Sequence, residues 1–298
     1  FAKKGRGYFM DYRCFGKIKN CSQMIEYFDD RHFRHSKYFH YSSLENINSI
    51  LESNEFWLGQ VKRFNDSNDS EQFDDGNRNF SLCFSSGINE NLPLWYFYGG
   101  ISGQGDRISF TKAKFKTFYE NAKFYLFPES KRNESIEITE NNASIKISDV
   151  LYFKEDENAN RKNEIQLKYN NLTNYILKPE EFQLLKNHKK GFMKSIAWFY
   201  EKETRIHIRL NDELAKKIDK SKVYHIAMHC DDLSKYASIT FAPNITKDML
   251  NKILKDNKAI EEIYLKNSRV QLSEYNGSVY FNLKDKLCDN CNKFKEKK

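Results

Sequence analysis

The stretch KYFHYSSLENINSIL, residues 37–51, changes from strand to helical periodicity and decides the first folding unit. Lys37–Tyr41 is aromatic and predicts a short strand. Ser42 and Glu45 have capping-box spacing, so a helix of about ten residues is expected to follow. Its apolar residues are Leu44, Ile47, Ile50 and Leu51. His40 would project beside the helix N-terminus, where backbone N–H groups favour polar or anionic ligands, or it is a structural histidine.

Working outward, many short strands and few helices are expected. Strands are predicted at 56–61, 80–85, 108–110, 136–138, 150–153, 204–210 and 223–230. Helices are predicted around Trp95, over 165–188 with an interruption before Pro179, and after Thr246, while 270–283 resembles a hairpin. No βαβ rhythm is present, so the predicted fold class is α+β. Residues 1–36 form an expected irregular extension, 37–283 the main domain, and 284–298 a basic tail.

Composition bounds the function classes. The chain has 298 residues, a formal charge of +8 and 15% aromatic residues, which suits a well-packed protein and permits an anionic partner. No apolar run of membrane-spanning length occurs, so no membrane partner is expected. The six cysteines are scattered, which favours a reducing cytoplasm. No Walker loop, HExxH, GxSxG or GxGxxG is present, so the common enzymes that carry them are excluded.

A metal site is not predicted. Cys288 and Cys291 form a CxxC, which supplies half of a zinc site, but a solvated tail with two free thiols is favoured. His32 and His35 lie beside arginines and are read as an exposed basic stretch.

The most informative chemistry lies in Trp198–Arg205. Strand alternation places Glu201, Glu203 and Arg205 on one side, and two carboxylates this close perturb each other's protonation. The following strand, 204–210, is expected to be half-buried with a basic face of Arg205, His207 and Arg209. A surface ladder of ion pairs is the alternative.

Two further segments are candidates for ligand contact. The aromatic run Leu92–Tyr98 supplies core packing first, but Trp95 or Tyr98 could stack on a flat ring. Asn65 and Asp66 form an Asn-Asp pair, for which a structural turn is the simpler interpretation.

Taken in order, these motifs resemble a family. His-Tyr-Ser-Ser-Leu-Glu, Asn-Asp…Glu, Cys-Phe-Ser…Leu-Trp-x-x-Tyr, Trp-x-x-Glu-x-Glu-x-Arg and Phe-Ala-Pro-Asn resemble a bacterial family of uncharacterised proteins related to the ADP-ribosyltransferase superfamily. The resemblance covers roughly residues 37–283. The chain departs from it at Ser67, where proline is frequent, and at Ala242, where glycine is frequent.

This resemblance implies a split two-sheet fold that grips NAD. It assigns His40 to the first motif, Trp95 or Tyr98 to the middle one, and Glu203 to the last, with Glu201 completing a Glu-x-Glu pair. Tyr41, Ser42, Asn65, Asp66 and Arg205 complete the implied NAD-binding set. Glu203 would stabilise the oxocarbenium-like state formed when the nicotinamide–ribose bond breaks, and Glu201 would orient or deprotonate the acceptor.

The implied activity is therefore NAD-dependent ADP-ribosyl transfer, in a toxin or antiviral effector restrained by an antitoxin-type inhibitory protein. The charge and the aromatics favour a nucleic acid acceptor, RNA before DNA. Three alternatives stay open: a protein ADP-ribosyltransferase or NAD glycohydrolase, a non-catalytic ligand-binding module, and a metal-dependent nuclease-like effector that uses Glu201 and Glu203.

Overall fold

A computed structural model describes residues 21–29, 33–64, 66, 71–73, 75–87, 89–98, 105–155, 165–169, 172–267 and 270–274. The chain divides into two compact units, each built from three separate segments. The first unit takes residues up to His35, Trp57–Ser85 and Lys123–Met228, and the second takes Ser36–Phe56, Ser86–Ala122 and the chain from His229 onward. Within the described part, no helix has the length and apolarity needed to cross a membrane.

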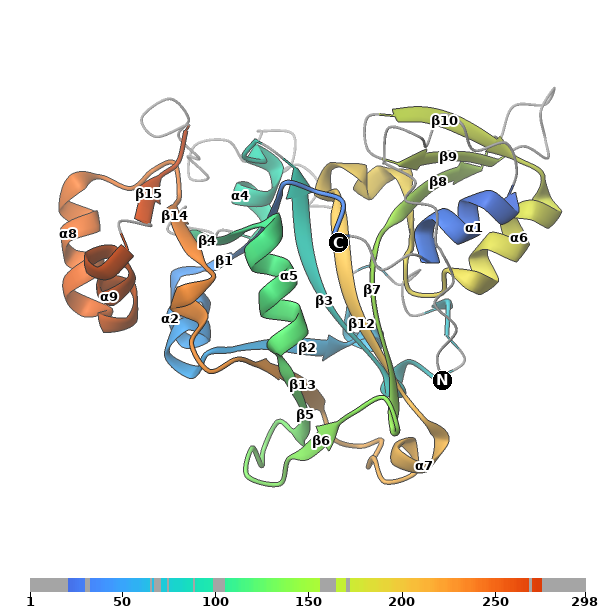
Figure 1. Cartoon of the computed structure of the whole chain (residues 1–298), viewed down its shortest axis with the longest axis horizontal. Coiled ribbons are helices and arrows are strands. Elements are labelled where there is room, and N and C mark those ends of the chain that lie inside the picture. The colour runs from blue at the N-terminus through green and yellow to red at the C-terminus, as the bar shows by residue number, and fades with distance from the viewer. Residues whose placement is uncertain are drawn as a thin grey trace, which may run out of the picture. The chain divides into compact units, whose positions relative to one another are not determined.

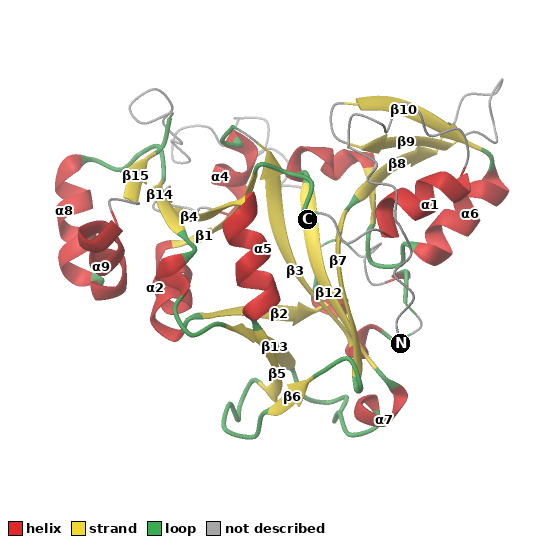
Figure 2. Cartoon of the chain, viewed as in Figure 1, coloured by secondary structure: helices red, strands yellow, loops and turns green. Residues whose placement is uncertain are grey.

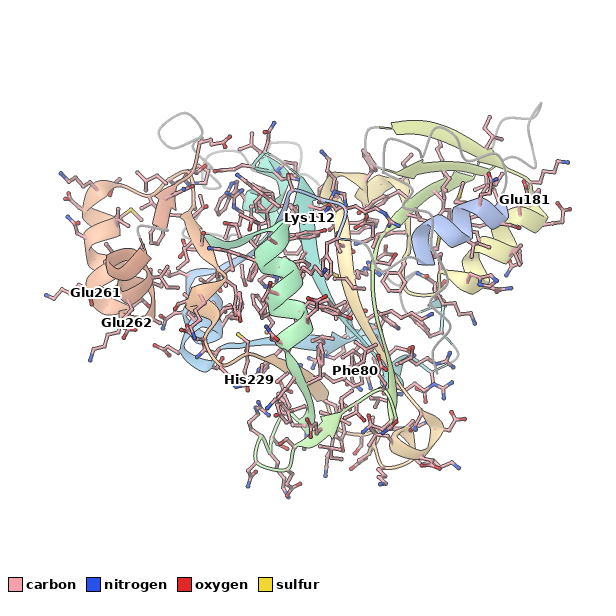
Figure 3. The ribbon with its side chains drawn as sticks, viewed as in Figure 1. Phe80, Lys112, Glu181, His229, Glu261 and Glu262 are labelled. Carbon is pink, nitrogen blue, oxygen red and sulfur yellow. The ribbon has the colours of Figure 1, made fainter. Side chains whose placement is uncertain are left out.

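The first unit is organised around a large sheet, in the order β7-β12-β3-β2-β13-β5-β6. Its strands are β2 (Glu55–Gln60), β3 (Asn79–Gly87), β5 (Lys123–Pro128), β6 (Ile136–Ile138), β7 (Ala143–Asp149), β12 (Glu203–Leu210) and β13 (Tyr224–His229). β12 pairs antiparallel with both β3 and β7, so Arg205 lies opposite Cys83 on one side and Ser148 on the other. The side chain of Phe80, on β3, is fully buried in this unit (Figure 3).

A smaller sheet in the same unit has the order β10-β9-β8-β11, from β8 (Leu151–Glu155), β9 (Ile165–Tyr169), β10 (Leu172–Leu177) and β11 (Met193–Ser195). Helices α1 (Cys21–Asp29) and α6 (Pro179–His188) pack against each other beside it (Figure 1). Apolar side chains from both helices and the sheet form one core, including Cys21, Met24, Leu151, Leu167 and Leu185. This unit also contains η2 (Val61–Arg63), η3 (Gly76–Arg78), η4 (Ile196–Glu201) and α7 (Asp212–Ala215).

The second unit contains a sheet in the order β15-β14-β4-β1, from β1 (Lys37–Ser43), β4 (Gly105–Thr111), β14 (Ser238–Phe241) and β15 (Val270–Leu272). Its helices are α2 (Leu44–Ser53), α4 (Leu92–Tyr98), α5 (Lys112–Asn121), η5 (Leu233–Lys235), α8 (Lys247–Asp256) and α9 (Lys258–Asn267) (Figure 2). Aromatic rings fill its core, with Tyr38 stacked on Phe115 at 4.1 Å between centroids. Strands and helices are thus mixed in both units, and the predicted α+β class is confirmed.

The cap residues locate the helix starts. Ser43, not Ser42, caps α2, because the Ser43 Oγ accepts a hydrogen bond from the Asn46 N–H. Ser42 is the penultimate residue of β1, so the strand runs two residues further than its aromatic pattern indicates. The prediction that Thr246 caps a helix is confirmed, since its Oγ1 accepts from the Met249 N–H.

Other local predictions were wrong. Residues 165–169 form β9 and residues 172–177 form β10 rather than a helix, because each pairs with a neighbouring strand of the small sheet. Residues 21–29 are helical instead of irregular, and Cys21 and Met24 belong to a core. The turn predicted at Asn276-Gly277 lies outside the described residues, as does the tail 284–298; β15 pairs parallel with β14.

Candidate active site

The candidate site is formed where β11, η4 and β12 follow one another along the chain. Ser195 ends β11 and caps η4 by accepting a hydrogen bond from the Ala197 N–H. η4 ends at Lys202, whose left-handed backbone (φ 46°, ψ 53°) turns the chain into β12. This reversal brings Glu201, before the turn, and Glu203, after it, to the same lysine of β11.

Lys194 is the centre of the cluster. Its Nζ lies 2.5 Å from Glu201 Oε2 and 2.9 Å from Glu203 Oε1. The second oxygen of Glu203 accepts a hydrogen bond from Arg205 Nε at 2.5 Å. The prediction that Glu201, Glu203 and Arg205 share one side of a strand is wrong for Glu201, which ends η4, but the turn at Lys202 still brings it into one connected network with Glu203, Arg205 and Lys194.

The surroundings hold this network in a buried, fixed geometry. The Arg205 guanidinium donates through Nη1 to the Gly191 carbonyl at 2.9 Å. The Glu203 backbone N–H donates to the Tyr152 hydroxyl, and the Trp198 ring lies 4.5 Å from Lys194 Nζ. All four charged side chains are 7% exposed or less.

The two carboxyl groups have opposite pKa shifts. Burial, the hydrogen bond to Glu203 and the charge of Glu203 raise the pKa of Glu201 to about 8. Burial acts in the same direction on Glu203, but the Arg205 charge, the hydrogen bond from Glu201 and the Lys194 charge outweigh it, so the pKa of Glu203 lies well below its ordinary value. One carboxyl group therefore exchanges a proton near neutral pH, while its neighbour stays ionised.

The basic face predicted for β12 is interior, which corrects the half-buried interpretation. Arg205 and His207 are buried and only Arg209 is exposed. The His207 ring stacks on Phe73 at 5.2 Å and its Nδ1 is hydrogen-bonded to Ser81 Oγ at 2.8 Å. Burial, followed by the charge of Arg205, lowers the pKa of His207 to about 3, so the ring is neutral. Phe73 and Phe192 contact the His207 ring and the Gly191 carbonyl bonds Arg205, so these residues cover this face of β12.

The basic stretch beside β7 is also less exposed than expected. His35 Nε2 lies 3.0 Å from Asp149 Oδ2, and Arg34 Nη1 lies 3.9 Å from the same oxygen, with side chains only 11% and 6% exposed. Asp149 additionally accepts a hydrogen bond from Thr204 Oγ1. His32 lies outside the described residues.

The predicted first motif belongs to the second unit. His40 is half-buried on β1 and its ring meets Phe56 edge-on, with centroids 5.3 Å apart. Tyr41 is buried, and its hydroxyl accepts hydrogen bonds from the Asn91 N–H and from Arg107 Nη1. Ser42 Oγ accepts from Asn46 Nδ2 at 3.1 Å.

The two candidates for the middle motif differ in exposure. Trp95 is 1% exposed, contacts Tyr41 edge-on and donates from Nε1 to Glu90 at 2.9 Å. Tyr98, three residues further along α4, is 39% exposed. Trp95 belongs to a charged network that the sequence did not predict. In it, Arg107 Nη2 lies 3.6 Å from Glu90 Oε1, and the Arg107 guanidinium lies 4.3 Å from the centre of the Phe39 ring.

The remaining predicted positions lie elsewhere. Asp66 is buried in the first unit, whereas Asn65, Cys288 and Cys291 lie outside the described residues. Among the residues with described positions, no group of three or more His, Cys, Asp or Glu side chains could hold a metal ion.

Sequence reasoning missed Lys194 because its position beside the two carboxyl groups depends on the pairing of β11 with β8 and on the turn at Lys202. It also missed Asp106 on β4, whose carboxyl is 0% exposed and makes no hydrogen bond in the described part of the structure. Burial alone raises the pKa of Asp106 well above its ordinary value, which favours the protonated form. The sequence carries no signal for either residue beyond a polar side chain within an apolar strand.

Comparison with known proteins gives no assignment: no family model, curated protein or solved structure matches this chain. The functional interpretation therefore depends on the geometry and on the motifs of the sequence.

Proposed function

We propose that this protein is an NAD-dependent ADP-ribosyltransferase with the split two-sheet fold of that superfamily, acting on nucleic acid, RNA before DNA. The observation that supports it most is the buried pair Glu201 and Glu203 held by Lys194 and Arg205, in which the surroundings raise the pKa of Glu201 and lower that of Glu203. We propose that it acts as a toxin or antiviral effector and that an inhibitory protein restrains it.

Glu203 is suited to the bond-breaking step. When the ribose–nicotinamide bond breaks, its electron pair leaves with nicotinamide and positive charge develops on the ribose. An ionised, buried carboxylate stabilises that charge without reorganising. Lys194 and Arg205 each bond one oxygen of Glu203, and the remaining lone pairs can accept a ribose 2′-hydroxyl.

Glu201 is suited to the second half of the reaction. The nucleophilic atom of the acceptor bonds to the ribose carbon and must lose its proton. A general base is most effective when its pKa lies near the working pH, which the raised pKa of Glu201 provides. The proposed contacts to ribose and nicotinamide are assigned to His40 and to Trp95 or Tyr98 by the sequence motifs alone; Trp95 is buried and Tyr98 is exposed.

The preference for a nucleic acid rests on fewer basic residues than expected. Arg205 and His207 are buried, so the support comes from Arg209, from the overall charge of +8 and from exposed rings such as Trp57 at 48% exposure. The metal-dependent alternative is disfavoured because the Lys194 ammonium already bonds both carboxyl groups that a divalent cation would need.

The test is incubation of the full chain with labelled NAD and total RNA, DNA or cell lysate. Wild type is expected to release nicotinamide and to label RNA. Glu203→Gln is expected to lose both activities. Glu201→Gln is expected to release nicotinamide but to transfer little label to RNA. Glu180→Gln, an exposed carboxylate on α6, is the matched control. Circular dichroism establishes that each variant is folded. Unchanged transfer by Glu203→Gln, or no nicotinamide release by wild type, refutes the proposal, and label on protein alone refutes the acceptor.

A further inference from the structure

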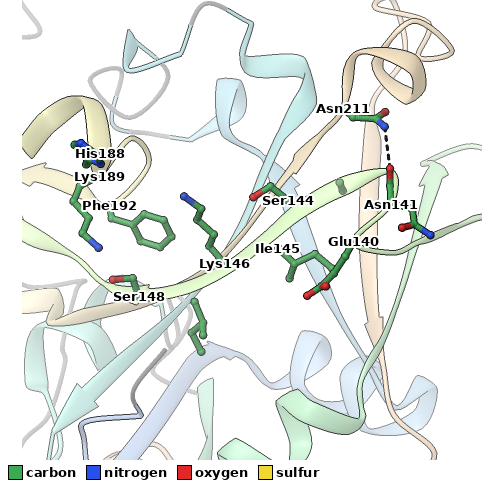
Figure 4. Close-up of a pocket in the computed structure, with 12 residues that line it drawn as sticks. Glu140, Asn141, Ser144, Ile145, Lys146, Ser148, His188, Lys189, Phe192 and Asn211 are labelled. Carbon is green, nitrogen blue, oxygen red and sulfur yellow. Dashed lines mark hydrogen bonds between the residues drawn. The ribbon is translucent and has the colours of Figure 1, made fainter. Parts of the chain in front are cut away.

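The edge of β7 carries an inference that goes beyond the proposed activity. Among the described strands, β7 pairs only with β12, so its other edge has no partner strand. A cavity of about 560 Å³ lies along it, lined by six consecutive residues of this strand, from Ala143 to Ser148 (Figure 4). Successive residues of a strand face opposite sides of a sheet, so a cavity that touches all of them follows the backbone edge.

Two backbone hydrogen bonds establish which backbone groups face the cavity. Asn211 N–H donates to the Asn142 carbonyl and Val150 N–H donates to the Glu203 carbonyl, so the even-numbered residues of β7 point toward β12. In an antiparallel pair the intervening residues point the other way. Ile145 and Ile147 therefore direct N–H and C=O groups outward, to the edge with no described partner strand.

The chain itself uses this edge one step further on. Leu151 N–H, which has the same outward direction, donates to the Phe192 carbonyl at 2.8 Å. β11 then follows Phe192 and pairs parallel with β8. The cavity thus begins where the pairing segment ends, and a strand placed in it would continue the same edge.

The charges around the cavity indicate what kind of strand fits. The exposed Lys146 lines it, together with the buried Lys189 and the His188 ring, and Glu140 lies toward one end (Figure 4). Arg209 is exposed on β12 opposite Ser144, on the same face of the sheet as Lys146. The other face presents Ile145 and Ile147. An added strand that alternates acidic and apolar side chains would match both faces.

We propose that the β7 edge binds an extended acidic peptide segment of a partner protein by strand addition. A row of outward N–H and C=O groups is matched by another strand, whereas a nucleic acid would use only the lysines. Six residues of strand span about 20 Å, which is enough for a specific linear segment.

The probe is a fluorescein-labelled hexapeptide of alternating Asp and Val, titrated by anisotropy against the full chain. Saturable binding is expected, with Lys146→Glu weakening it by about tenfold or more. Lys123→Glu, an exposed lysine on β5, should leave it unchanged. A peptide of the same composition in two blocks, Asp-Asp-Asp-Val-Val-Val, should bind less well.

N-methylated peptides separate strand addition from simple charge attraction. Methyl groups on one alternate set of amides should abolish binding, and those on the other set should leave it intact, because only one set faces β7. Equal effects of the two sets, no binding at about 1 mM peptide, or binding of an oligothymidylate in place of the peptide would each overturn the proposal. None of these readouts depends on NAD cleavage.

Discussion

Replacing Lys194 with methionine tests the buried cluster most directly. The change keeps an unbranched side chain of similar length but removes the ammonium that bonds Glu201 and Glu203 at 2.5 and 2.9 Å. Each charge-assisted hydrogen bond contributes about 1.5 to 3 kcal/mol. Glu203 keeps its Arg205 partner and Glu201 can remain protonated, so we expect a loss of about 2 to 4 kcal/mol in the free energy of unfolding at pH 7, toward the lower part of the range for broken buried pairs.

The loss should depend on pH in a defined direction. A carboxyl group whose pKa is lowered in the folded state contributes stability above its unfolded pKa, and this contribution disappears as the pH falls through the folded value. Lys194 provides part of that lowering for Glu203, whose ordinary pKa is 4.5. The difference in the free energy of unfolding between wild type and Lys194→Met should therefore be largest at neutral pH and should decrease as the pH falls below about 4.

The assay is urea unfolding followed by circular dichroism between pH 3 and 8. The control is Lys123→Met, at an exposed lysine on another strand of the first unit. It should change the free energy of unfolding by less than about 0.5 kcal/mol. Equal stability of Lys194→Met and wild type at pH 7, or a gap that stays constant down to pH 3, would show that Lys194 does not hold the two carboxyl groups as described.

Three other substitutions have defined outcomes. The pKa of Glu201 is raised in the folded state, so its contribution to stability is present below the unfolded pKa and is lost as the pH rises. In urea unfolding, the free energy of unfolding of Glu201→Gln should therefore match that of wild type at pH 5 and exceed it by about 1 to 2 kcal/mol at pH 9. Parallel curves of unfolding free energy against pH would contradict this. Lys202 has a left-handed backbone conformation, which glycine adopts easily and valine does not. Differential scanning calorimetry should show that Lys202→Gly changes stability by less than about 0.5 kcal/mol, whereas Lys202→Val costs about 1 to 2 kcal/mol. Equal effects of the two substitutions would contradict the left-handed conformation. Asp106→Asn should raise the thermal midpoint at pH 8 by about 2 to 6 °C, because burial opposes ionisation of the Asp106 carboxyl in the folded state and an amide avoids that cost. A lower midpoint would show that the Asp106 carboxyl has a hydrogen-bond partner that the fold requires.

Much of the local structure could be predicted because short-range periodicity determines it. The β1–α2 connection, the strand that became β12 and the Thr246 cap all follow from patterns within about ten residues. Residues 165–177 show the limit of the method, because short runs of apolar residues suit a strand or a helix equally well. Pairing with β8 decides the outcome there, and that information lies outside the segment.

The candidate site was predictable in its acidic half only. Period-two alternation places Glu203 and Arg205 together, but Glu201 joins them through the turn at Lys202, and the position of Lys194 depends on the parallel pairing of β11 with β8. No pattern of the local sequence encodes that route. The second unit behaves similarly, since Arg107 contacts Tyr41 and Thr240 across neighbouring strands.

The burial of β12 shows why the basic face was misread. Alternating cations indicate a solvated face only when they lack partners, and here Arg205 has Glu203 and the Gly191 carbonyl, while His207 is neutral and bonded to Ser81. Arg209, the last cation of the face, is the exposed one. Apolar residues often replace a buried ion network without loss of stability. Stability alone therefore does not account for the network of Lys194, Glu201, Glu203 and Arg205, and the Glu201 and Glu203 variants are the experiments that test whether it has the proposed catalytic role.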